Sequence, residues 1–444
     1  MIKLSPEIIT IIMLGGVLVG LLIGYHLGAI LAGVALVVGY LTWGGPVTEL
    51  FYTRMYELIR SYVILAVPLF IFMGLMLERS GIAEGLYKAL YLWLGGFRGG
   101  LAISTVLIGT ILAATVGIIG ASVTMLALIA LPAMLKRGYS KSLASGAVCA
   151  GGTLGILIPP SIMLVIYGPM AMISVGKLFM AAIFPGLVLS GLYCSYIALR
   201  CLLQPAIAPA VPSEERAVPF IKKTTILLAS LVPPAVLVLA VLGSIFFGIA
   251  PPTEAASVGA FAATLLAIGY RKFGWQVLKE VALQTMRVSS MVIFIAVGGY
   301  MFTGVFLGLG GGDVVKDLVL ASPGGRWGAF AVIMFIVFIL GMFIDWIGII
   351  FIMIPIITPI GDALGFNSLW FAMMIIVNLQ MSFMTPPLAY AIFYVRGAAD
   401  PGLGITTADI IRGVIPFVAL IAIGLGLFII FPDIILWLPS MMIK

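Results

Sequence analysis

The chain has 444 residues, of which 63% are hydrophobic and only 9% are charged, and its mean hydropathy is +1.28. This composition excludes a soluble globular protein and predicts an all-α protein that crosses a membrane many times. The net charge of +7 does not indicate nucleic-acid binding, because Lys and Arg lie in short clusters between apolar runs, as in membrane loops. Three cysteines without CxxC spacing, Cys149, Cys194 and Cys201, predict neither a disulfide framework nor a zinc site.

The first quarter of the chain alternates apolar runs with amphipathic segments. Because ~20 apolar residues span the hydrocarbon core, we expect ten full crossings and two re-entrant hairpins along the chain. The first run lacks a small-residue cleavage site and is expected to be a retained helix rather than a signal peptide. We predict crossings at 8–24, 27–43 and 61–77, interfacial helices at 46–60 and 82–94, and a first hairpin at 99–135, interrupted near 115–122.

The next apolar run, residues 142–167, contains an unusual cluster of helix-breaking residues. Gly151, Gly152, Gly155, Pro159 and Pro160 lie within eleven positions of one another. Glycine weakens a helix, and an interior proline removes a backbone donor and clashes with the preceding turn. In hydrocarbon, an opened backbone is tolerated only where protein buries it or where it lines a wet cavity. We therefore predict a broken helix whose free amides and carbonyls face a cargo or an ion.

The second half of the chain repeats this order of segments. After a crossing at 178–199, a loop at 204–223 with four prolines is the natural linker, and we expect it on the cytoplasmic side. The second half then contains crossings at 224–247 and 254–270, a charged segment at 271–287, a second hairpin at 327–360 and a second broken span at 370–396.

A shift of 227 residues aligns the two halves without a gap. It pairs Arg60 with Arg287, Gly138 with Gly365, and the Pro-Pro pair at 159–160 with the pair at 386–387. Paired interrupted segments in two repeats are the sequence signature of a transporter whose site lies at the repeat interface. We assign 1–203 and 224–444 to two repeats, with a transport domain at 99–167 and 327–396.

The distribution of basic residues predicts how the chain is oriented. When the loop with Lys136, Arg137 and Lys141 is cytoplasmic, most of the 23 Lys and Arg residues are also cytoplasmic. The two hairpins then enter the membrane from opposite sides. We therefore expect inverted repeats, with both termini outside.

The tip of the first hairpin contains small residues and hydroxyl groups: Thr115, Gly117, Gly120 and Ser122. Sodium requires hard oxygen ligands and close approach of the backbone, so this composition fits an ion site. Small residues also permit tight packing of membrane helices, which is the alternative interpretation.

The tip of the second hairpin contains Asp345, followed by Trp346 and Gly348, deep in an apolar run. A carboxylate at the bilayer centre costs about 2.5–3.5 kcal/mol or more and indicates a functional site. Alternatively, Asp345 caps the following helix, and Trp346 is a packing residue. The second broken span adds Asn378, Gln380, Thr385 and Pro386, of which the two amides could instead bridge neighbouring helices.

Two further polar residues are assigned structural roles. Glu254 begins a span, where an acid suits the helix dipole. His26, the single histidine, lies in the turn between the first two spans. Ser122 and His26 could form the nucleophile and base of an intramembrane hydrolase, but this alternative is not favoured. The chain also lacks a GxxxxGK[ST] loop, so ATP hydrolysis is not expected and we predict no enzymatic activity.

Four stretches resemble the large membrane subunit (the DctM-like M subunit) of tripartite ATP-independent periplasmic (TRAP) transporters. They are residues 129–139, 151–161, 248–256, and Asp345 together with 378–387. The resemblance covers nearly the whole chain. It implies a sodium-driven, elevator-type importer in the bacterial inner membrane, without a cofactor. It also implies a small four-helix membrane partner, the Q subunit, and an extracytoplasmic binding protein that delivers a small organic anion.

Site residues follow from the hairpin tips and broken spans together with this resemblance. Expected sodium ligands are Gly117, Gly120, Ser122, Gly152, Thr153, Gly155, Pro159, Asp345, Gly348, Asn378, Thr385 and Pro386. Expected substrate contacts are Thr115, Thr153, Ser161, Asp345, Trp346 and Gln380. The isoleucines between Gly117 and Gly120, and Trp346 after Asp345, depart from the family pattern and indicate an altered cargo pocket. The alternative function is a self-sufficient sodium-coupled carboxylate carrier without a binding protein.

Overall fold

The computed structural model describes residues 4–117 and 119–442, without the side chains of residues 114–116. Within these ranges every regular element is a helix, and nine helices are long and apolar enough to cross a membrane. The prediction of an all-α polytopic membrane protein is confirmed. The nine include α7 and α16, which follow the two predicted hairpin tips.

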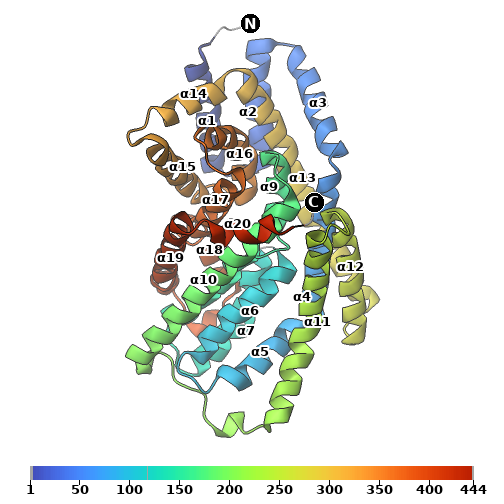
Figure 1. Cartoon of the computed structure of the whole chain (residues 1–444), viewed down its shortest axis with the longest axis vertical. Helices are drawn as coiled ribbons and strands as arrows, with labels where there is room; N and C mark the ends of the chain where they lie inside the picture. Colours follow the sequence, from blue (N-terminus) through green and yellow to red (C-terminus); the bar gives the residue numbers. More distant parts are fainter. Residues whose placement is uncertain (1–3, 118, 443–444) are drawn as a thin grey trace.

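The first half runs from α1 to α10 and ends in a long helix (Figure 1). Its α-helices are α1 (Pro6–Ile23), α2 (Leu27–Trp43), α3 (Pro46–Arg60), α4 (Ala66–Arg79), α5 (Ile82–Leu94), α6 (Gly100–Val116), α7 (Ile119–Lys136), α8 (Lys141–Thr153), α9 (Ile162–Ala171) and α10 (Val175–Leu203). The second half follows a linker that ends at Pro219, four residues earlier than the sequence predicts. Its α-helices are α11 (Phe220–Phe246), α12 (Pro252–Gly269), α13 (Trp275–Gly308), α14 (Gly311–Leu320), α15 (Gly325–Gly341), α16 (Trp346–Ala363), α17 (Ser368–Ser382), α18 (Tyr390–Ala398), α19 (Thr407–Ile430) and α20 (Asp433–Ser440).

Several helices of the two halves begin at positions 227 residues apart. Helices α7 and α16 begin at Ile119 and Trp346, and α8 and α17 begin at Lys141 and Ser368. In Figure 1 the α6–α7 pair lies in the lower half of the molecule and the α15–α16 pair in the upper half.

The halves differ where a separate charged segment was expected at residues 271–287. In the first half, α3 ends at Arg60 and α4 begins at Ala66, whereas in the second half the corresponding residues form the single 34-residue helix α13. Pro68 in the first turn of α4 explains the difference, because it has no N–H and its ring would clash with the carbonyl of a helical residue four positions earlier. The position 227 residues later is Ile295, which a helix accepts.

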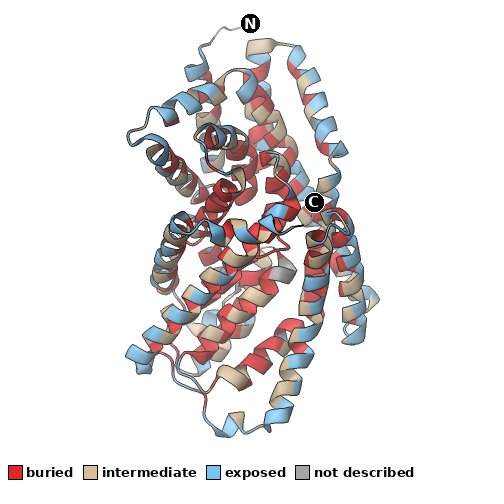
Figure 2. Ribbon diagram, viewed as in Figure 1, coloured by how far each residue is buried: buried red, intermediate tan, exposed pale blue. Residues whose placement is uncertain are grey.

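Both predicted broken spans are interrupted. Helix α8 ends at Thr153 and α9 begins at Ile162, and α17 ends at Ser382 and α18 begins at Tyr390. Each gap contains a cis Pro-Pro peptide bond, at 159–160 and at 386–387. The interrupted helices lie in the interior, where buried residues concentrate, while α3 and α11 are largely exposed (Figure 2).

Glycines allow the interior helices to approach one another closely. A Cβ atom added at Gly109 of α6 would lie 2.5 Å from the carbonyl carbon and oxygen of Gly151 on α8. A Cβ at Gly146 of α8 would lie 2.3 Å from the carbonyl oxygen of Gly413 on α19. The helix α8 therefore packs closely against both α6 and α19, with backbone atoms in direct contact.

The linker between the halves is attached to the ends of the first hairpin. The backbone N–H of Ser140 donates to the carbonyl of Ile207 at 2.8 Å, and that of Val211 donates to Gly95 at 2.7 Å. The Glu215 carboxylate accepts hydrogen bonds from Arg137, at the end of α7, and from the hydroxyl of Tyr91 on α5. The hydrogen bond from Arg137 lowers the pKa of Glu215 below its ordinary value of 4.5.

The contact through Glu215 is expected to open in acid. The pKa of Glu215 is lower in the folded protein than in the unfolded chain. Its ionised carboxylate therefore stabilises the attached linker at any pH above the unfolded-state pKa, and this stabilisation is lost as the pH falls through the folded-state pKa. The protection of the amides of residues 205–216, measured against the intrinsic exchange rate at each pH, should therefore fall below about pH 4.5 in the wild type, and Glu215→Gln should show the low protection at pH 7. Glu214→Gln is the matched control, because Glu214 makes no ion pair within the described ranges. Equal exchange in both variants would contradict this role of Glu215.

Candidate functional site

A cavity of about 350 Å³ lies where the two hairpin tips approach each other. Residues from both tips and both broken spans form one side, and the α1–α2 turn and α13 form the other. The lining residues are Leu21, Tyr25, His26, Leu27, Ile119, Gly120, Ile162, Val288, Met291, Val292, Ile295, Asp345, Trp346, Ile347, Tyr390 and Tyr394. Its volume suits a small organic molecule.

Asp345 is the one acidic residue among the described residues of this lining. It immediately precedes α16 and occupies the N-cap position of this helix. The geometry is not that of a regular side-chain capping hydrogen bond. Tyr390 and Tyr394, one turn apart on α18, lie close enough to interact electrostatically with Asp345. The Asp345 carboxylate therefore lies both at the N-terminal end of α16 and at the wall of the cavity.

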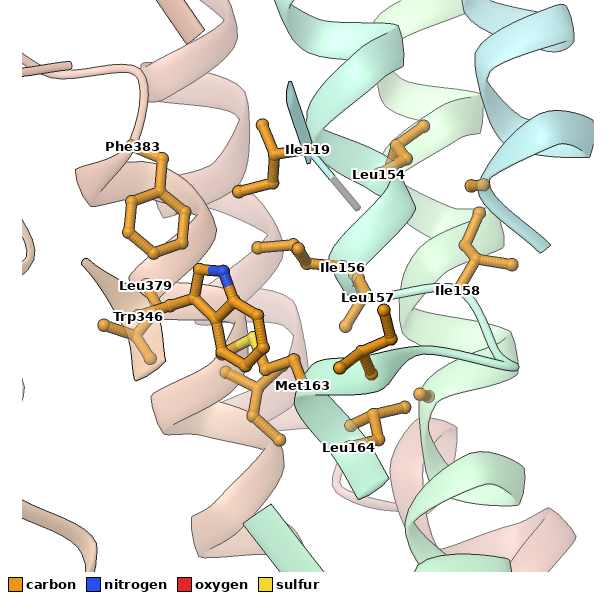
Figure 3. Close-up of a cluster of buried hydrophobic side chains, with 14 of the residues drawn as sticks. Ile119, Leu154, Ile156, Leu157, Ile158, Met163, Leu164, Trp346, Leu379 and Phe383 are labelled. Atoms are coloured by element: carbon orange, nitrogen blue, oxygen red, sulfur yellow. The ribbon is translucent and has the colours of Figure 1, made fainter. Parts of the chain in front are cut away.

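Trp346 joins the two halves through an apolar cluster (Figure 3). Its side chain is only 8% exposed and lies among Ile119, Ile156 and Met163 of the first half. Part of its surface lines the cavity. Trp346 thus combines the two roles considered for it, a packing residue and a wall of the pocket.

The first hairpin tip packs against the first broken span. A Cβ at Gly117, whose φ is +63°, would lie 3.3 Å from the carbonyl oxygen of Pro160, and one at Gly155 would lie 3.1 Å from the Ser122 hydroxyl oxygen. The Ser122 hydroxyl is buried and has no hydrogen-bond partner among the described residues. Ser161 donates a 2.5 Å hydrogen bond to the carbonyl of Ile156, across the gap in the helix.

The second tip and the second broken span make a similar contact. A Cβ at Gly341 would lie 2.6 Å from the Ser382 hydroxyl oxygen, and the N–H of Leu388 donates to the carbonyl of Met342 at 3.3 Å. Asn378 is nearly fully buried and donates a 2.7 Å hydrogen bond to the carbonyl of Met334 on α15. This bond matches the bridging alternative for Asn378.

Several expected site residues lie outside the cavity lining. Gln380 donates a 3.4 Å hydrogen bond to the Tyr193 hydroxyl on α10, and the hydroxyl of Thr153 bonds the carbonyl of Ala150 and lies 3.6 Å from the sulfur of Met384. Gly348 packs on Leu27, Gly152 packs on Val123, and the hydroxyl of Thr385 bonds the carbonyl of Met381. The side chain of Thr115 lies outside the described residues.

The cavity also contains functional candidates that the sequence did not indicate. His26 caps α2 by accepting a 3.3 Å hydrogen bond from the N–H of Gly28 at Nδ1. The neutral ring then has its proton on Nε2, which leaves a donor available at the wall of the cavity. Tyr25 lines the same wall. The i, i+4 spacing of Tyr390 and Tyr394 directly after a proline break was the available signal for those two residues.

The pair considered for a hydrolase is not assembled. Ser122 makes no hydrogen bond to a described residue, and His26 bonds the backbone of its own turn. Among the described residues there is also no group of three His, Cys, Asp or Glu side chains that could hold a metal.

Interrupted helices that border a mostly apolar cavity with one carboxylate, in a chain of many apolar helices, are features typical of a membrane transport protein. The family model described as the DctM component of the tripartite ATP-independent periplasmic transporter matches residues 13–434. The chain belongs to this family and is a large permease subunit of a TRAP transporter. This family is not enzymatic, in agreement with the expectation of no catalytic activity.

Named relatives match along most of their length. The C4-dicarboxylate TRAP transporter large permease protein DctM of Pseudomonas aeruginosa is 31% identical over 87% of this chain and 88% of its own. The ectoine TRAP transporter large permease protein TeaC of Halomonas elongata is 28% identical over 97% and 99%. The structure of the YdaH transporter of Alcanivorax borkumensis has the same fold at 15% identity, with a TM-score of 0.64 over 96% of this chain and 98% of its own.

Proposed function

We propose that this permease subunit imports a small organic acid into the cell and that the inward movement of sodium drives the import. The observation that carries the proposal is the 350 Å³ cavity shared by both hairpin tips and both broken spans, with Asp345 at its wall. A site at the meeting point of two repeats is what an alternating-access carrier requires, because either half can close it from one side.

The proposed mechanism is an elevator. Residues 99–167 and 327–396 form the moving transport domain, and the cavity is bounded on its other side by the α1–α2 turn and α13 of the scaffold. The 227-residue offset of α7 from α16 and of α8 from α17 supports two repeats, and the position of the hairpins in opposite halves of Figure 1 supports their inversion. We infer a location in the bacterial inner membrane, with a cytoplasmic linker at 204–223 and both termini periplasmic.

Each proposed sodium site lies between a hairpin tip and the broken span that packs against it. Behind the first tip, the unpartnered Ser122 hydroxyl faces Gly155, and the Pro160 carbonyl lies next to Gly117 without a hydrogen-bond donor among the described residues. Hydroxyl and carbonyl oxygens are the hard ligands that such a cation prefers. Behind the second tip, the corresponding ligands would come from Gly341 to Gly348 and from the gap between α17 and α18.

The proposed site for the substrate carboxylate is the start of α7. Ile119 and Gly120 line the cavity at this helix N-terminus, where free backbone N–H groups and the helix dipole attract an anion. The relatives named for C4-dicarboxylates, ectoine and 2,3-diketo-L-gulonate indicate that the cargo is an organic acid.

We infer two protein partners. One is a small four-helix membrane subunit, the Q subunit. The relative from Oleidesulfovibrio alaskensis is named DctMQ, a name that joins M and Q in one chain, and this chain covers 56% of it. The other is an extracytoplasmic substrate-binding protein that delivers the acid, in accordance with the family description as a tripartite periplasmic transporter.

Reconstitution in liposomes tests these proposals together. The chain and its small partner are inserted into vesicles, candidate binding proteins are added with radiolabelled organic acids, and uptake is measured with an inward sodium gradient or with potassium in its place. Uptake that requires both the binding protein and sodium is expected. Sodium-driven uptake without any binding protein would instead support the self-sufficient carrier, and uptake that ignores sodium would contradict both.

A further inference from the structure

A second cavity, which shares no described lining residue with the proposed substrate cavity, lies between helices α1, α14, α15 and α16 (Figure 1). Its volume is about 260 Å³. Thr10 is the one polar residue of its described lining, and the Thr10 hydroxyl donates a 2.8 Å hydrogen bond to the carbonyl of Pro6. No side-chain donor of this lining is therefore free, so a polar occupant would lose its hydrogen bonds to water. The cavity suits an apolar group.

The cavity extends over the depth of one leaflet of a bilayer. On α1 its lining runs from Thr10 to Leu18, a rise of about 12 Å along the helix. Its lining also includes Ile344, beside the tip of the second hairpin. Half of the hydrocarbon core is ~15 Å thick. An apolar chain that enters at the level of Thr10 would therefore end near the middle of the membrane.

The lining reaches the outer surface of the helix bundle at α1 and α14. Val17 and Val319 are nearly fully buried, whereas the adjacent lining residues Leu18 and Leu318 are 43% and 71% exposed. Helix α1 is a candidate membrane span of which only 17% is buried, so most of its surface faces lipid. The cavity is therefore accessible from the bilayer.

The size of the cavity favours a lipid chain over a helix of another protein. Helix α14 packs directly on α1, α15 and α16, and packed helices leave no room between them for a further helix about 10 Å wide. An apolar cavity of about 150 Å³ holds one benzene molecule, so a volume of about 260 Å³ suits a flexible chain of on the order of ten carbons.

The helix that forms one wall also carries exposed charges of both signs. Val314 and Leu318 of α14 line the cavity, while Asp313, Lys316 and Asp317 of the same helix are exposed and make no ion pair among the described residues. A helix with an apolar face and a charged face is typical of the membrane interface. A lysine binds a phosphate group and a carboxylate binds an ammonium group, so this face of α14 complements a zwitterionic phospholipid headgroup.

We propose that this cavity binds one acyl chain of a zwitterionic phospholipid, whose headgroup lies at the charged face of α14. Helices α1 and α14 belong to the proposed scaffold, and the lining residues of α15 and α16 belong to the proposed transport domain. The bound chain therefore lies at the boundary across which the proposed elevator moves, and it favours the arrangement of the two parts in this structure. This consequence rests on the proposed function, whereas the binding of the lipid does not.

Photo-crosslinking tests the site with a phosphatidylethanolamine that carries a diazirine in its acyl chain. The full chain and its small membrane partner are reconstituted in vesicles that contain a small fraction of this probe, and labelled peptides are identified by mass spectrometry after irradiation. Labelling of the cavity wall on α15 and α16 should exceed labelling at Leu22, which is 81% exposed on α1, by about threefold, as expected from exposed ion pairs to the headgroup. A fatty acid with the same diazirine chain lacks the ammonium group and should label the wall less.

Variants separate binding in the cavity from general contact with lipid. Val314→Phe fills part of the cavity and should reduce labelling of its wall to the level at Leu22. Val19→Phe makes the same change at an exposed position of α1 outside the lining and should have no effect. Lys316→Gln leaves the cavity unchanged and should reduce labelling by phosphatidylethanolamine, whereas Lys177→Gln on α10 should not.

Three results would overturn the inference. They are wall labelling no stronger than that at Leu22, wall labelling that Val314→Phe leaves unchanged, and wall labelling that occurs in the chain alone but disappears when the small membrane partner is added. Stronger labelling by the fatty acid would overturn the assignment to a phospholipid. Loss of sodium-driven uptake in the same vesicles would contradict the proposed function without affecting the labelling, so the two failures are distinguishable.

Discussion

Gly109→Ala is expected to destabilise the protein and abolish transport, although it adds a single methyl group. The new Cβ would lie 2.5 Å from the carbonyl carbon and oxygen of Gly151 and 2.7 Å from its Cα. These are backbone atoms, so no side-chain rotation relieves the clash, and α6 must move away from the broken helix. Overpacking of this kind costs about 1–3 kcal/mol, which exceeds the gain of at most ~1 kcal/mol in helix propensity.

Gly191→Ala is the matched control for this prediction. Gly191 lies within helix α10, and a Cβ there would have no atom within 4 Å. The same chemical change should therefore leave the thermal unfolding midpoint unchanged or raise it, and uptake should persist. The two variants are compared by thermal unfolding in detergent and by uptake in liposomes. A midpoint for Gly109→Ala at or above that of Gly191→Ala would contradict the close crossing of α6 and α8.

Ser122→Ala is expected to weaken sodium binding without weakening the fold. The Ser122 side chain is 1% exposed, and its hydroxyl has no hydrogen-bond partner in the described part of the chain. Burying an unpaired hydroxyl costs about 1–3 kcal/mol, so its removal should preserve or raise stability in sodium-free buffer. If the hydroxyl is an ion ligand, the sodium concentration for half-maximal stabilisation should rise about tenfold, a loss of ~1.4 kcal/mol.

Ser104→Ala provides the contrast on the other arm of the same hairpin. Ser104 is also fully buried, but its hydroxyl donates a 2.8 Å hydrogen bond to the carbonyl of Gly100. This variant should lose about 1 kcal/mol of stability and keep the sodium dependence of the wild type. The thermal unfolding midpoint is titrated with sodium chloride at constant ionic strength for all three proteins. A Ser122→Ala protein with wild-type sodium dependence would reduce Ser122 to a packing residue.

The polar residues predicted in apolar runs lie in different surroundings. Asp345 lines the cavity, whereas Asn378 bonds to α15 and Gln380 to α10. The sequence cannot separate these cases, because a polar group in a membrane helix is satisfied equally well by a neighbouring helix or by a cargo. Only the packing of α17 against its neighbours makes the distinction.

The sequence by itself determined the class of protein, the helical segments and the positions where helices are interrupted. These features are local, since they depend on the length of each apolar run and on proline residues that cannot donate a hydrogen bond. The same reasoning expected a separate segment at 271–287, which the structure joins into α13 because no proline interrupts it.

Only the tertiary structure decided which residues share the cavity. His26, Tyr25, Tyr390 and Asp345 are separated by up to 365 positions in the chain, and the packing of hairpins and broken helices brings them together. A lone histidine in a turn has no local signal of function, because its role depends on what faces it. Which charged and aromatic side chains face the cavity follows from that three-dimensional arrangement.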